Sequence, residues 1–385
     1  MKVLGLILEL NPPHTGHAYF IDQAKKIVRP DYTICTLSTS FCQRGLPSCI
    51  DKWQKAKIAL KLGVDFVFEL PVSNFMQSAD AFCRGSIEIL TKLNVTDIAF
   101  GAELTNLDKL KEIVNIMESV TYNNSLKNYL AKGSSYASSS LKAMMEQTSD
   151  QEIIDNLSLP NNILALGYLK ALKYYPNINI HLIKRINNDY NDLKLTKNGY
   201  SSASAVRYAI SANNKDYLNY VIDKEYEYLD EKLLLDNLFK LIRYQFAIHD
   251  LSYFKDIICV DEGIEVRIKH FLYQANSFKE LASLVRTKRY SLNHVNRVLV
   301  NIALENKKTE EYEYLRLLAF DKDKKAYLSS LDKRIKKLIF SSPLDHEGPI
   351  IFNELKASKI YDIISGKLTY TNEYAAPITG DEEDE

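Results

Sequence analysis

Two histidines flank a glycine close to the start of the chain, in the run His14-Thr-Gly-His17. The run separates an apolar segment of strand length from a segment with helical periodicity, so we expect it at a strand-to-helix turn. The N-terminus of a helix offers unpaired N–H groups and a positive dipole to phosphate. Gly16 would let a triphosphate approach the backbone, and the imidazoles would donate to phosphate oxygens as charge develops in an in-line displacement. The motif therefore predicts a nucleotide site with phosphate chemistry, although two unrelated loop histidines would give the same pattern.

The elements around the motif follow from the hydrophobic pattern. Residues 2–9 are apolar, as in a buried parallel strand, and apolar residues recur at helical spacing over 16–28. Pro12 and Pro13 prevent an earlier helix start, and Thr15 is the expected N-cap. These features place the two histidines at the carboxyl end of the first strand.

Residues 1–210 alternate strand and helix patterns. The expected strands are 2–9, 32–38, 64–70, 96–100 and 178–184, and the expected helices are 16–28, 52–62, 78–92, 106–119 and 162–174. This alternation predicts an α/β fold with a Rossmann-like parallel sheet and helices on both faces. Ligands of such sheets bind at the carboxyl ends of the strands, so the loops that follow the first four strands should converge on one crevice.

The rest of the chain shows different patterns. Residues 120–160 are polar and rich in Ser and Asn, which indicates an insertion or loop followed by a helix. Beyond the alternating part the strand patterns fade, and long amphipathic stretches predict an α-helical domain over 211–370. Residues 371–385 end in Gly380-Asp-Glu-Glu-Asp-Glu385 and are expected to form an acidic tail. We therefore expect a catalytic domain over 1–210, a helical domain and a tail.

The composition is that of a globular protein without an overall charge bias. Lys+Arg and Asp+Glu both number 49, so a nucleic-acid partner would need a local basic face. The five cysteines are odd in number and include no CxxC pair, which argues against a metal site or a disulfide framework. No apolar run reaches the roughly 20 residues of a membrane span, and the N-terminus lacks the pattern of a signal peptide. We expect a cytoplasmic protein with no membrane partner, no DNA partner and no protein-bound metal.

A second polar turn has residues that bind phosphate. Ser201, Ser202 and Ser204 lie at the start of a predicted helix, and Arg207 follows within one turn. Hydroxyls and backbone N–H groups there would hold the β- and γ-phosphates of a nucleotide, with the arginine binding one phosphate through its forked donors. An ordinary capped helix start with an exposed arginine gives the same pattern.

Several short motifs together resemble a known family. They are Gly5-Leu-Ile-Leu-Glu-Leu-Asn-Pro-Pro-His-Thr-Gly-His17, Phe41-Cys-Gln-Arg-Gly-Leu-Pro47, Asp51-Lys-Trp53, Glu69-Leu-Pro71, Gln77-Ser-Ala79, Phe100-Gly-Ala-Glu103, Pro160-Asn-Asn-Ile-Leu164, Ser201-Ser-Ala-Ser-Ala-Val-Arg207 and Thr287-Lys-Arg-Tyr290. In this order, over residues 1–300, they resemble the bacterial tRNA(Met) cytidine acetate ligase family. The chain departs from the family's usual pattern at Leu10 and Pro13, where aromatic residues are common, and at His294, where an arginine is common.

The resemblance implies a nucleotidyltransferase-like fold and a two-step reaction. Acetate attacks the α-phosphate of ATP to give acetyl-adenylate, and the acetyl group then passes to N4 of the wobble cytidine of elongator methionine tRNA. His14, His17 and Arg207 are the expected catalytic residues, and Mg²⁺ would bridge the pyrophosphate. One of the two asparagines after Pro160 is expected to cap a helix and the other, Asn162, to contact the nucleotide. The expected ATP contacts are Ile7, Leu8, Glu9, Leu10, Asn11, Pro12, Pro13, His14, Thr15, Gly16, His17, Phe20, Gly101, Asn161, Asn162, Arg185, Ile186, Ser201, Ser202 and Ser204.

The candidate contacts for the acid and the tRNA are mostly cationic. Arg44 or Lys52 would orient acetate or neutralise pyrophosphate, and ordinary surface charge is the alternative. A basic run with a tyrosine would contact RNA phosphates and stack on a base, or else form a solvated helix face. The residues of this run and one turn beyond are Arg286, Lys288, Arg289, Tyr290 and Arg297.

Two other functions fit the same residues. A nucleotidyltransferase that joins an adenylyl group to a small phosphate ester, making a dinucleotide-type cofactor, would use the same histidine and serine motifs. It would not need a helical domain with a basic and aromatic run. A non-catalytic tRNA-binding protein with a vestigial nucleotide fold is the second alternative, and the intact His14, Gly16, His17 and Arg207 argue against it.

Overall fold

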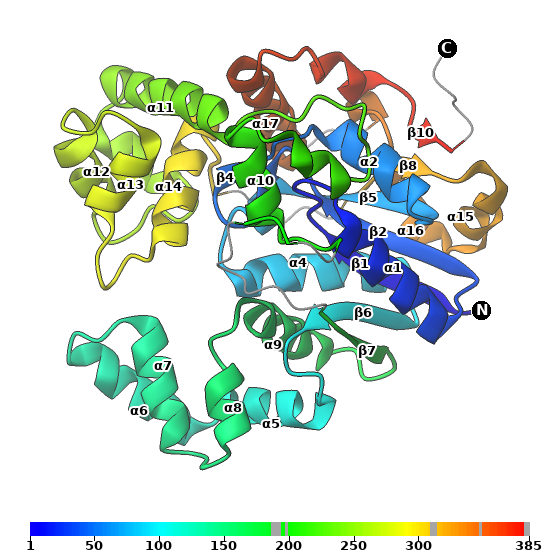
Figure 1. The fold of residues 1–385 in the computed structure, drawn as a ribbon, viewed down its shortest axis with the longest axis horizontal. Helices are drawn as coiled ribbons and strands as arrows, with labels where there is room; N and C mark the ends of the chain where they lie inside the picture. The colour runs from blue at the N-terminus through cyan, green and yellow to red at the C-terminus, as the bar shows by residue number, and fades with distance from the viewer. Residues whose placement is uncertain (186–193, 197–198, 309–313, 346–348, 381–385) are drawn as a thin grey trace.

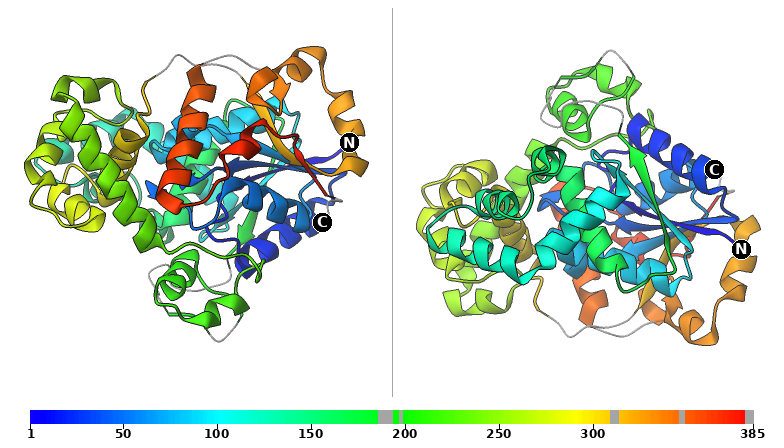
Figure 2. Two further views of the ribbon diagram at one scale, coloured as in Figure 1. Left: turned by 90° about the horizontal axis from the view of Figure 1, so that it is seen from above. Right: turned by 90° about the horizontal axis from the view of Figure 1, so that it is seen from below.

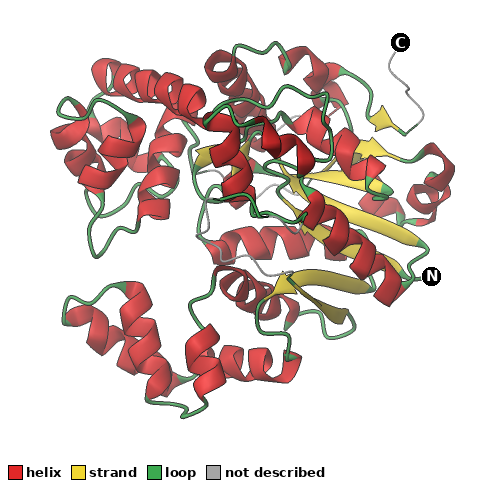
Figure 3. Ribbon diagram, viewed as in Figure 1, coloured by secondary structure: helices red, strands yellow, loops and turns green. Residues whose placement is uncertain are grey.

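The computed structural model describes residues 1–185, 194–196, 199–308, 314–345 and 349–380. A twisted sheet lies between helices, and two groups of helices extend on the side away from the N-terminus (Figure 1; Figure 2). The strands of the sheet are gathered in one half of the molecule, and the extending groups contain helices and loops (Figure 3). The predicted α/β class with a Rossmann-like sheet is confirmed.

Within the described residues the sheet has eight strands, in the order β10-β8-β5-β2-β1-β6-β7, with β9 paired to β8. These strands are β1 (Val3–Leu8), β2 (Tyr32–Ser38), β5 (Phe66–Leu70), β6 (Asp97–Ala102), β7 (Asn179–Lys184), β8 (Leu315–Phe320), β9 (Ile339–Phe340) and β10 (Ile378–Thr379). The five strands expected from the apolar runs are mutually parallel and lie within two residues of their predicted bounds. A separate hairpin is formed by β3 (Phe41–Cys42) and β4 (Leu46–Pro47).

Alternate side chains of β1 contact the two layers of helices that cover the sheet. Leu4, Leu6 and Leu8 pack in one apolar cluster with α1 and α2. Val3 and Ile7 point to the opposite face, into the cluster that α4, α5 and α9 cover. The covering helices are α1 (Thr15–Val28), α2 (Lys52–Lys61), α4 (Ala79–Lys92), α5 (Leu107–Glu118) and α9 (Pro160–Leu172), all of which the sequence predicted.

Residues 120–160 form helices, which agrees with the predicted insertion and not with the loop that was its alternative. They contain α6 (Val120–Ala131), α7 (Tyr136–Met145) and α8 (Gln151–Asn156), which lie together with α5 in the lower helical group of Figure 1. Ser135 caps α7 by accepting from the backbone N–H of Ser138. The loop alternative was wrong because serines that favour turns also cap helices, and tertiary packing stabilises the helix that follows.

The C-terminal half is mainly helical, as predicted, but it also returns to the sheet. Its helices are α10 (Ala203–Ser211), α11 (Glu231–Ile248), α12 (Ile264–Leu272), α13 (Phe278–Val285), α14 (Leu292–Leu304), α15 (Ala326–Ser330), α16 (Lys333–Leu338) and α17 (Pro349–Ser365). Short turns of 3₁₀ helix are η1 (Lys215–Asn219), η2 (Leu251–Asp256), η3 (Lys322–Lys324), η4 (Pro343–Asp345) and η5 (Tyr370–Tyr374). The prediction of an α-helical domain over 211–370 is wrong at β8, which pairs antiparallel with β5 and extends the sheet. We call residues 231–304, with α11 to α14, the helical lobe.

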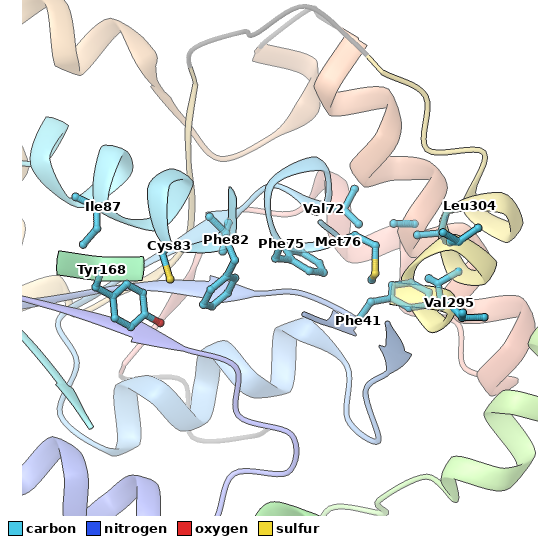
Figure 4. Close-up of a cluster of buried hydrophobic side chains, with 14 of the residues drawn as sticks. Phe41, Val72, Phe75, Met76, Phe82, Cys83, Ile87, Tyr168, Val295 and Leu304 are labelled. Carbon is cyan, nitrogen blue, oxygen red and sulfur yellow. The ribbon is translucent and has the colours of Figure 1, made fainter. Parts of the chain in front are cut away.

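One apolar core joins the sheet to the helical lobe. Its members include Phe75 of α3 (Val72–Phe75), Met76 directly after α3, and Phe82 of α4. They share one cluster with Val295 and Leu304 of α14 (Figure 4). Gly45 of the β3–β4 hairpin has a positive φ of 75°, and a Cβ there would lie 2.3 Å from the backbone nitrogen of Arg297. The lobe therefore packs directly against the loop that follows β2.

A buried ion network ties the end of the chain to the sheet. Lys52 Nζ lies 2.8 Å from a carboxylate oxygen of Glu69 and 2.7 Å from one of Glu373. Arg316 Nη1 lies 3.3 Å and 2.7 Å from the other oxygens of the same two carboxylates. None of the four side chains is more than 1% exposed. The expectation of a tail over 371–385 is thus wrong for its first residues, which form η5 and β10; residues 381–385 lie outside the described part.

Candidate functional site

The loop between β1 and α1 is fixed from both sides. Asn11 is buried, and its side chain donates to Cys42 Sγ (2.9 Å) and accepts from the backbone N–H of Cys49 (2.9 Å). On the other side, the Thr15 N–H donates to the carbonyl of Tyr220 at 2.8 Å. The Asn-Pro-Pro run therefore serves to hold the histidine motif in place.

The two histidines cap α1 with their own rings. His14 is the N-cap, and its Nδ1 accepts from the N–H of Gly16 at 3.0 Å. His17 Nδ1 accepts from the His14 N–H at 3.2 Å, and the two ring centroids are 4.0 Å apart. Because both Nδ1 atoms are acceptors, both neutral rings carry their proton on Nε2 and can donate it to a ligand. The expectation that Thr15 caps the helix is wrong, since its hydroxyl donates to the carbonyl of Gly199 (2.8 Å).

Gly16 is required by this arrangement. A Cβ at this position would lie 2.7 Å from Cε1 of the His14 ring, closer than carbon atoms approach without a shift. The glycine therefore lets the imidazole fold back over the first turn of α1, in addition to leaving room for phosphate.

Burial keeps both imidazoles neutral. It lowers the pKa of His14 well below its usual value, and the charges of His17, Arg185 and Arg207 lower it further. Burial, with Arg185 and Lys55, lowers the pKa of His17 to about 3. The two rings therefore act as neutral hydrogen-bond donors until a phosphate approaches them.

Acid is expected to destabilise the protein through these two histidines. The unfolded chain takes up protons on them near pH 6.5, whereas the folded state keeps His17 neutral down to about pH 3. Between these values the unfolded state binds more protons, so the free energy of unfolding falls as the pH falls. The slope is about 1.4 kcal/mol per pH unit for each histidine. Urea unfolding from pH about 7 to about 5 measures it. A His17→Asn variant should show a shallower slope, and an unchanged slope would contradict the lowered pKa.

A cavity of about 250 Å³ opens at the carboxyl ends of β1, β6 and β7. It is lined by residues of both helix layers and by the segment before α10. The predicted residues that line it are Ile7, Leu8, Glu9, His14, Gly16, His17, Phe20, Gly101, Asn161, Arg185, Ser201 and Ser202. The loops that follow β1 and β6 and the turn before α10 converge here, as the sequence predicted. The loops that follow β2 and β5 were also expected in this crevice, and that expectation is wrong because neither contributes a lining residue.

Other predicted residues lie behind the cavity wall or beyond the described chain. Those outside the lining are Leu10, Asn11, Pro12, Pro13, Thr15, Asn162, Ser204 and Arg207. Ile186 lies outside the described residues. The structure adds lining residues that the sequence analysis missed: Tyr19, Phe82, Phe100, Leu164, Tyr168, Ile183, Lys184 and Tyr200. Leu164 and Tyr168 are four residues apart on a predicted helix, so helical spacing would have placed them on one face.

Arg207 holds the loop and the helical lobe together and does not face the cavity. Its Nη1 donates to the carbonyl of Asn11 (2.6 Å), and its Nε donates to Glu231 of α11 (3.2 Å). The sequence analysis expected this guanidinium to bind phosphate, but each of its three nitrogens already donates to a protein acceptor, with Nη2 bonded to the Ser204 hydroxyl (3.3 Å). Ser202 caps α10 by accepting from Ala205 N–H at 3.1 Å, which leaves this helix start beside the cavity.

The two asparagines at the start of α9 have different surroundings. Asn162 is buried, and its Oδ1 accepts from the N–H groups of Glu103 and Leu104 at 3.0 Å each. Asn161 lines the cavity and donates to Glu103, whose carboxylate also accepts from the Asn162 N–H at 2.9 Å. The prediction that Asn162 contacts the nucleotide is therefore wrong, because Asn162 is buried outside the cavity lining and Asn161 lies in it. The N-cap position is Leu159, so neither asparagine caps the helix.

This difference predicts opposite effects of two alanine substitutions. Asn162→Ala leaves the N–H groups of Leu104, which is buried, and of Glu103, which is partly buried, without an acceptor, and should lower the free energy of unfolding by about 2–4 kcal/mol. Asn161→Ala should leave stability nearly unchanged and weaken nucleotide binding. Urea unfolding and titration with ATP distinguish the two. Equal loss of stability in both variants would contradict these roles.

The expected cationic contacts for the acid have other roles. Lys52 is buried in the ion network with Glu69 and Glu373, so it does not face the cavity. Arg44 is half-buried outside the lining, and the Glu9 carboxylate partly offsets the lowering of its pKa by burial. Neither residue is positioned to contact acetate in the cavity.

The predicted RNA contacts all lie on the helical lobe, and all but one of them are at least partly exposed in a single loop of it. Arg286, Lys288 and Arg289 are exposed in the loop between α13 and α14, and Tyr290 stacks on His294 with ring centroids 5.7 Å apart. We call residues 286–290 the basic loop. Arg297 is half-buried and donates to the carbonyl of Gln43 (3.3 Å), so the expectation of an exposed contact there is wrong. None of the helices in the described ranges is long and apolar enough to cross a bilayer.

A mostly parallel sheet with a histidine-capped helix start and a second helix N-terminus at one cavity defines a nucleotidyltransferase class of fold and site. The comparisons with known proteins agree. The chain belongs to the HIGH Nucleotidyl Transferase family, whose model matches residues 1–375, and its relatives there are tRNA(Met) cytidine acetate ligases.

The similarity to these relatives spans nearly the whole chain. The chain is 33% identical over 395 residues to the tRNA(Met) cytidine acetate ligase of Clostridium perfringens, and the match covers 97% of this chain and 98% of the relative. It is 37% identical over 370 residues to that of Thermosipho melanesiensis, covering 90% and 86%. The structure of Thermotoga maritima TmcAL bound with alpha-thio ATP matches with a TM-score of 0.85 at 26% identity, covering 98% of this chain and 99% of that one.

Proposed function

We propose that this chain is an ATP-dependent tRNA(Met) cytidine acetate ligase. It would convert acetate and ATP to acetyl-adenylate and transfer the acetyl group to N4 of the wobble cytidine of elongator methionine tRNA. The observation that supports the proposal most is the pair of neutral imidazoles, fixed by their Nδ1 atoms at a helix N-terminus inside the cavity. The family membership and the names of the relatives support the substrates.

In the first step a carboxylate oxygen of acetate attacks the α-phosphorus of ATP. A new P–O bond forms as the bond to the β-phosphate oxygen breaks, and pyrophosphate leaves. The Nε2 donors of His14 and His17 would stabilise charge on the α-phosphate, and the starts of α1 and α10 offer backbone N–H groups to the other oxygens. Positioning and charge neutralisation are what this reaction requires.

We propose Mg²⁺ as the metal that accompanies the triphosphate. In the part of the chain that the structure describes, no group of three or more His, Cys, Asp or Glu is placed to hold a metal ion. The cavity lining provides the carboxylate of Glu9. This donor set fits Mg²⁺, which keeps several waters and binds phosphates with one or two carboxylates. When bound, the ion would neutralise charge on the leaving pyrophosphate.

In the second step the exocyclic amine of cytosine attacks the acetyl carbonyl carbon. The C–N bond forms, AMP leaves and the amine loses a proton. The base must leave its stack to reach the cavity, and an anticodon loop is already partly splayed. We propose residues 1–210 as the catalytic part and the helical lobe as the tRNA-binding part, with Arg286, Lys288 and Arg289 of the basic loop on RNA phosphates. The five free thiols suit a reducing cytoplasm.

The experiment combines purified protein, ATP, Mg²⁺, labelled acetate and bulk tRNA, with nucleoside mass spectrometry of the product. We expect N4-acetylcytidine in a single tRNA and pyrophosphate exchange into ATP that depends on acetate. Exchange that depends on a small phosphate ester would favour a dinucleotide-forming enzyme. Binding of tRNA without any exchange would favour a non-catalytic binding protein. Omission of Mg²⁺ should abolish exchange.

A further inference from the structure

The cavity has two walls of different chemistry, one on each side of the sheet edge. On the side of α1 it is lined by histidines, serines and the ends of β7. On the side of α4 and α9 it is lined by Ile7, Phe82, Phe100, Leu164 and Tyr168, which all belong to or pack against the apolar core on that face. We call these five residues the apolar wall. None of them is cationic, so this wall suits a small apolar group and not a phosphate.

Close helix packing fixes the apolar wall. A Cβ at Gly167 would lie 2.7 Å from Cys83 Sγ, so α9 can approach α4 this closely only with glycine at that position. The Tyr168 ring centroid is 5.1 Å from that of Phe100 and 6.4 Å from that of Phe82. Figure 4 shows Tyr168, Cys83 and Phe82 side by side in this core. The wall is therefore formed before any ligand enters.

The Tyr168 side chain brings one polar atom to this wall. Tyr168 lines the cavity, and no hydrogen bond joins its hydroxyl to another described residue. The hydroxyl is not one of the fully buried polar atoms that lack a partner, so it keeps contact with the cavity space, where a ligand can accept a hydrogen bond from it. Burial, with Cys83 and Glu9, raises the pKa of Tyr168 well above its usual value, which keeps the hydroxyl protonated and able to donate.

The in-line geometry of the first step selects the occupant. Thr15 of α1 bonds to Gly199 and Tyr220, which places the helix start of α10 on the α1 side of the cavity. Under the proposed function the start of α10 holds the pyrophosphate, which would leave toward that side, so the attacking carboxylate would approach the α-phosphate from the opposite side. The opposite side is the apolar wall.

We propose that the apolar wall is the acyl pocket, in which Phe82, Phe100 and Leu164 surround the methyl group of acetate while the Tyr168 hydroxyl donates to a carboxylate oxygen. This inference rests on the proposed function and names the residues that select and orient the acid. Glu9 lies within electrostatic reach of Tyr168, and its Oε1 is held by the Gln43 N–H (2.7 Å). A donor at Tyr168 would therefore favour the oxygens of acetate in a cavity that already contains a carboxylate.

The test measures acetate-dependent and propionate-dependent pyrophosphate exchange for three variants. Tyr168→Phe removes only the hydroxyl and should raise the KM for acetate about 10–100-fold, with the KM for ATP unchanged. Leu164→Ala makes room for one more methylene and should raise kcat/KM for propionate relative to acetate at least about 10-fold. Tyr174→Phe is the matched control, because Tyr174 follows the same helix and is 83% exposed, and it should behave as the wild type.

Each outcome decides a separate point. Absence of acetate-dependent exchange in the wild type overturns the proposed function and the inference together. A wild type that exchanges with acetate, beside variants with unchanged acetate parameters, overturns only the acyl pocket. A rise in the KM for ATP in Tyr168→Phe would assign the wall to adenine, and an effect confined to tRNA acetylation would assign it to cytosine. If Tyr168→Phe does not fold, as judged by thermal unfolding, the propionate preference of Leu164→Ala decides.

Discussion

Replacing His17 with asparagine is expected to reduce acetate-dependent pyrophosphate exchange about 10²–10³-fold while leaving the fold intact. The Oδ1 of asparagine can take the place of Nδ1 and accept from the His14 N–H, which preserves the cap of α1. Asparagine is too short to supply the donor that His17 presents on Nε2. The variant therefore removes the phosphate contact and keeps the helix start, and the exchange rate under saturating ATP measures the loss.

His17→Gln is the matched control for this prediction. The longer amide can bring an N–H close to the position of Nε2 but leaves the backbone N–H of His14 without its acceptor. We expect it to retain more exchange activity than His17→Asn and to lose about 1 kcal/mol of stability, measured by urea unfolding. Should the asparagine variant exchange as fast as the wild type, the α-phosphate lies away from the histidines. The assigned mechanism would then fail.

The parts of the fold that were predictable share a physical cause. The strands β1, β2, β5 and β6 are buried on both faces, so each is a short apolar run between turn signals, and each parallel connection needs a helix between its strands. β8 has the same apolar pattern, but it follows about a hundred helical residues and pairs antiparallel with β5. Its place beside β5 depends on long-range pairing, which no local pattern encodes.

The candidate site was predictable where chemistry lies in a contiguous motif and less so where it depends on packing. His14, Gly16 and His17 line the cavity as expected, because their neighbours in sequence fix them. Arg207 has the residue type of a phosphate contact, but its neighbour Glu231 comes from another element. In the sequence, Tyr168 has the spacing of a core residue of an amphipathic helix. It lines the cavity because the strands beside it end there, and this depends on the tertiary fold.

Replacing Glu373 with glutamine is expected to lower the free energy of unfolding by about 3–5 kcal/mol. The change is nearly isosteric, so the loss comes from charge and not from packing. In the wild type two cations, Lys52 and Arg316, share two carboxylates, and the cluster is neutral. The variant leaves two buried cations with one carboxylate, and burial makes an uncompensated charge costly. Urea unfolding of the full chain measures the loss.

A double-mutant cycle separates this pairing from general effects of mutation. Lys52→Met alone leaves an excess carboxylate and should also destabilise the protein, whereas Lys52→Met with Glu373→Gln restores a neutral cluster of one cation and one carboxylate. We expect the double variant to lose less stability than the sum of the single variants, by about 1–3 kcal/mol. Glu225→Gln, at an exposed position, is a control that should change stability by less than about 0.5 kcal/mol. Additive losses would mean that Lys52 and Glu373 act independently, and the end of the chain would then be held to the sheet mainly by the packing of α17 and η5.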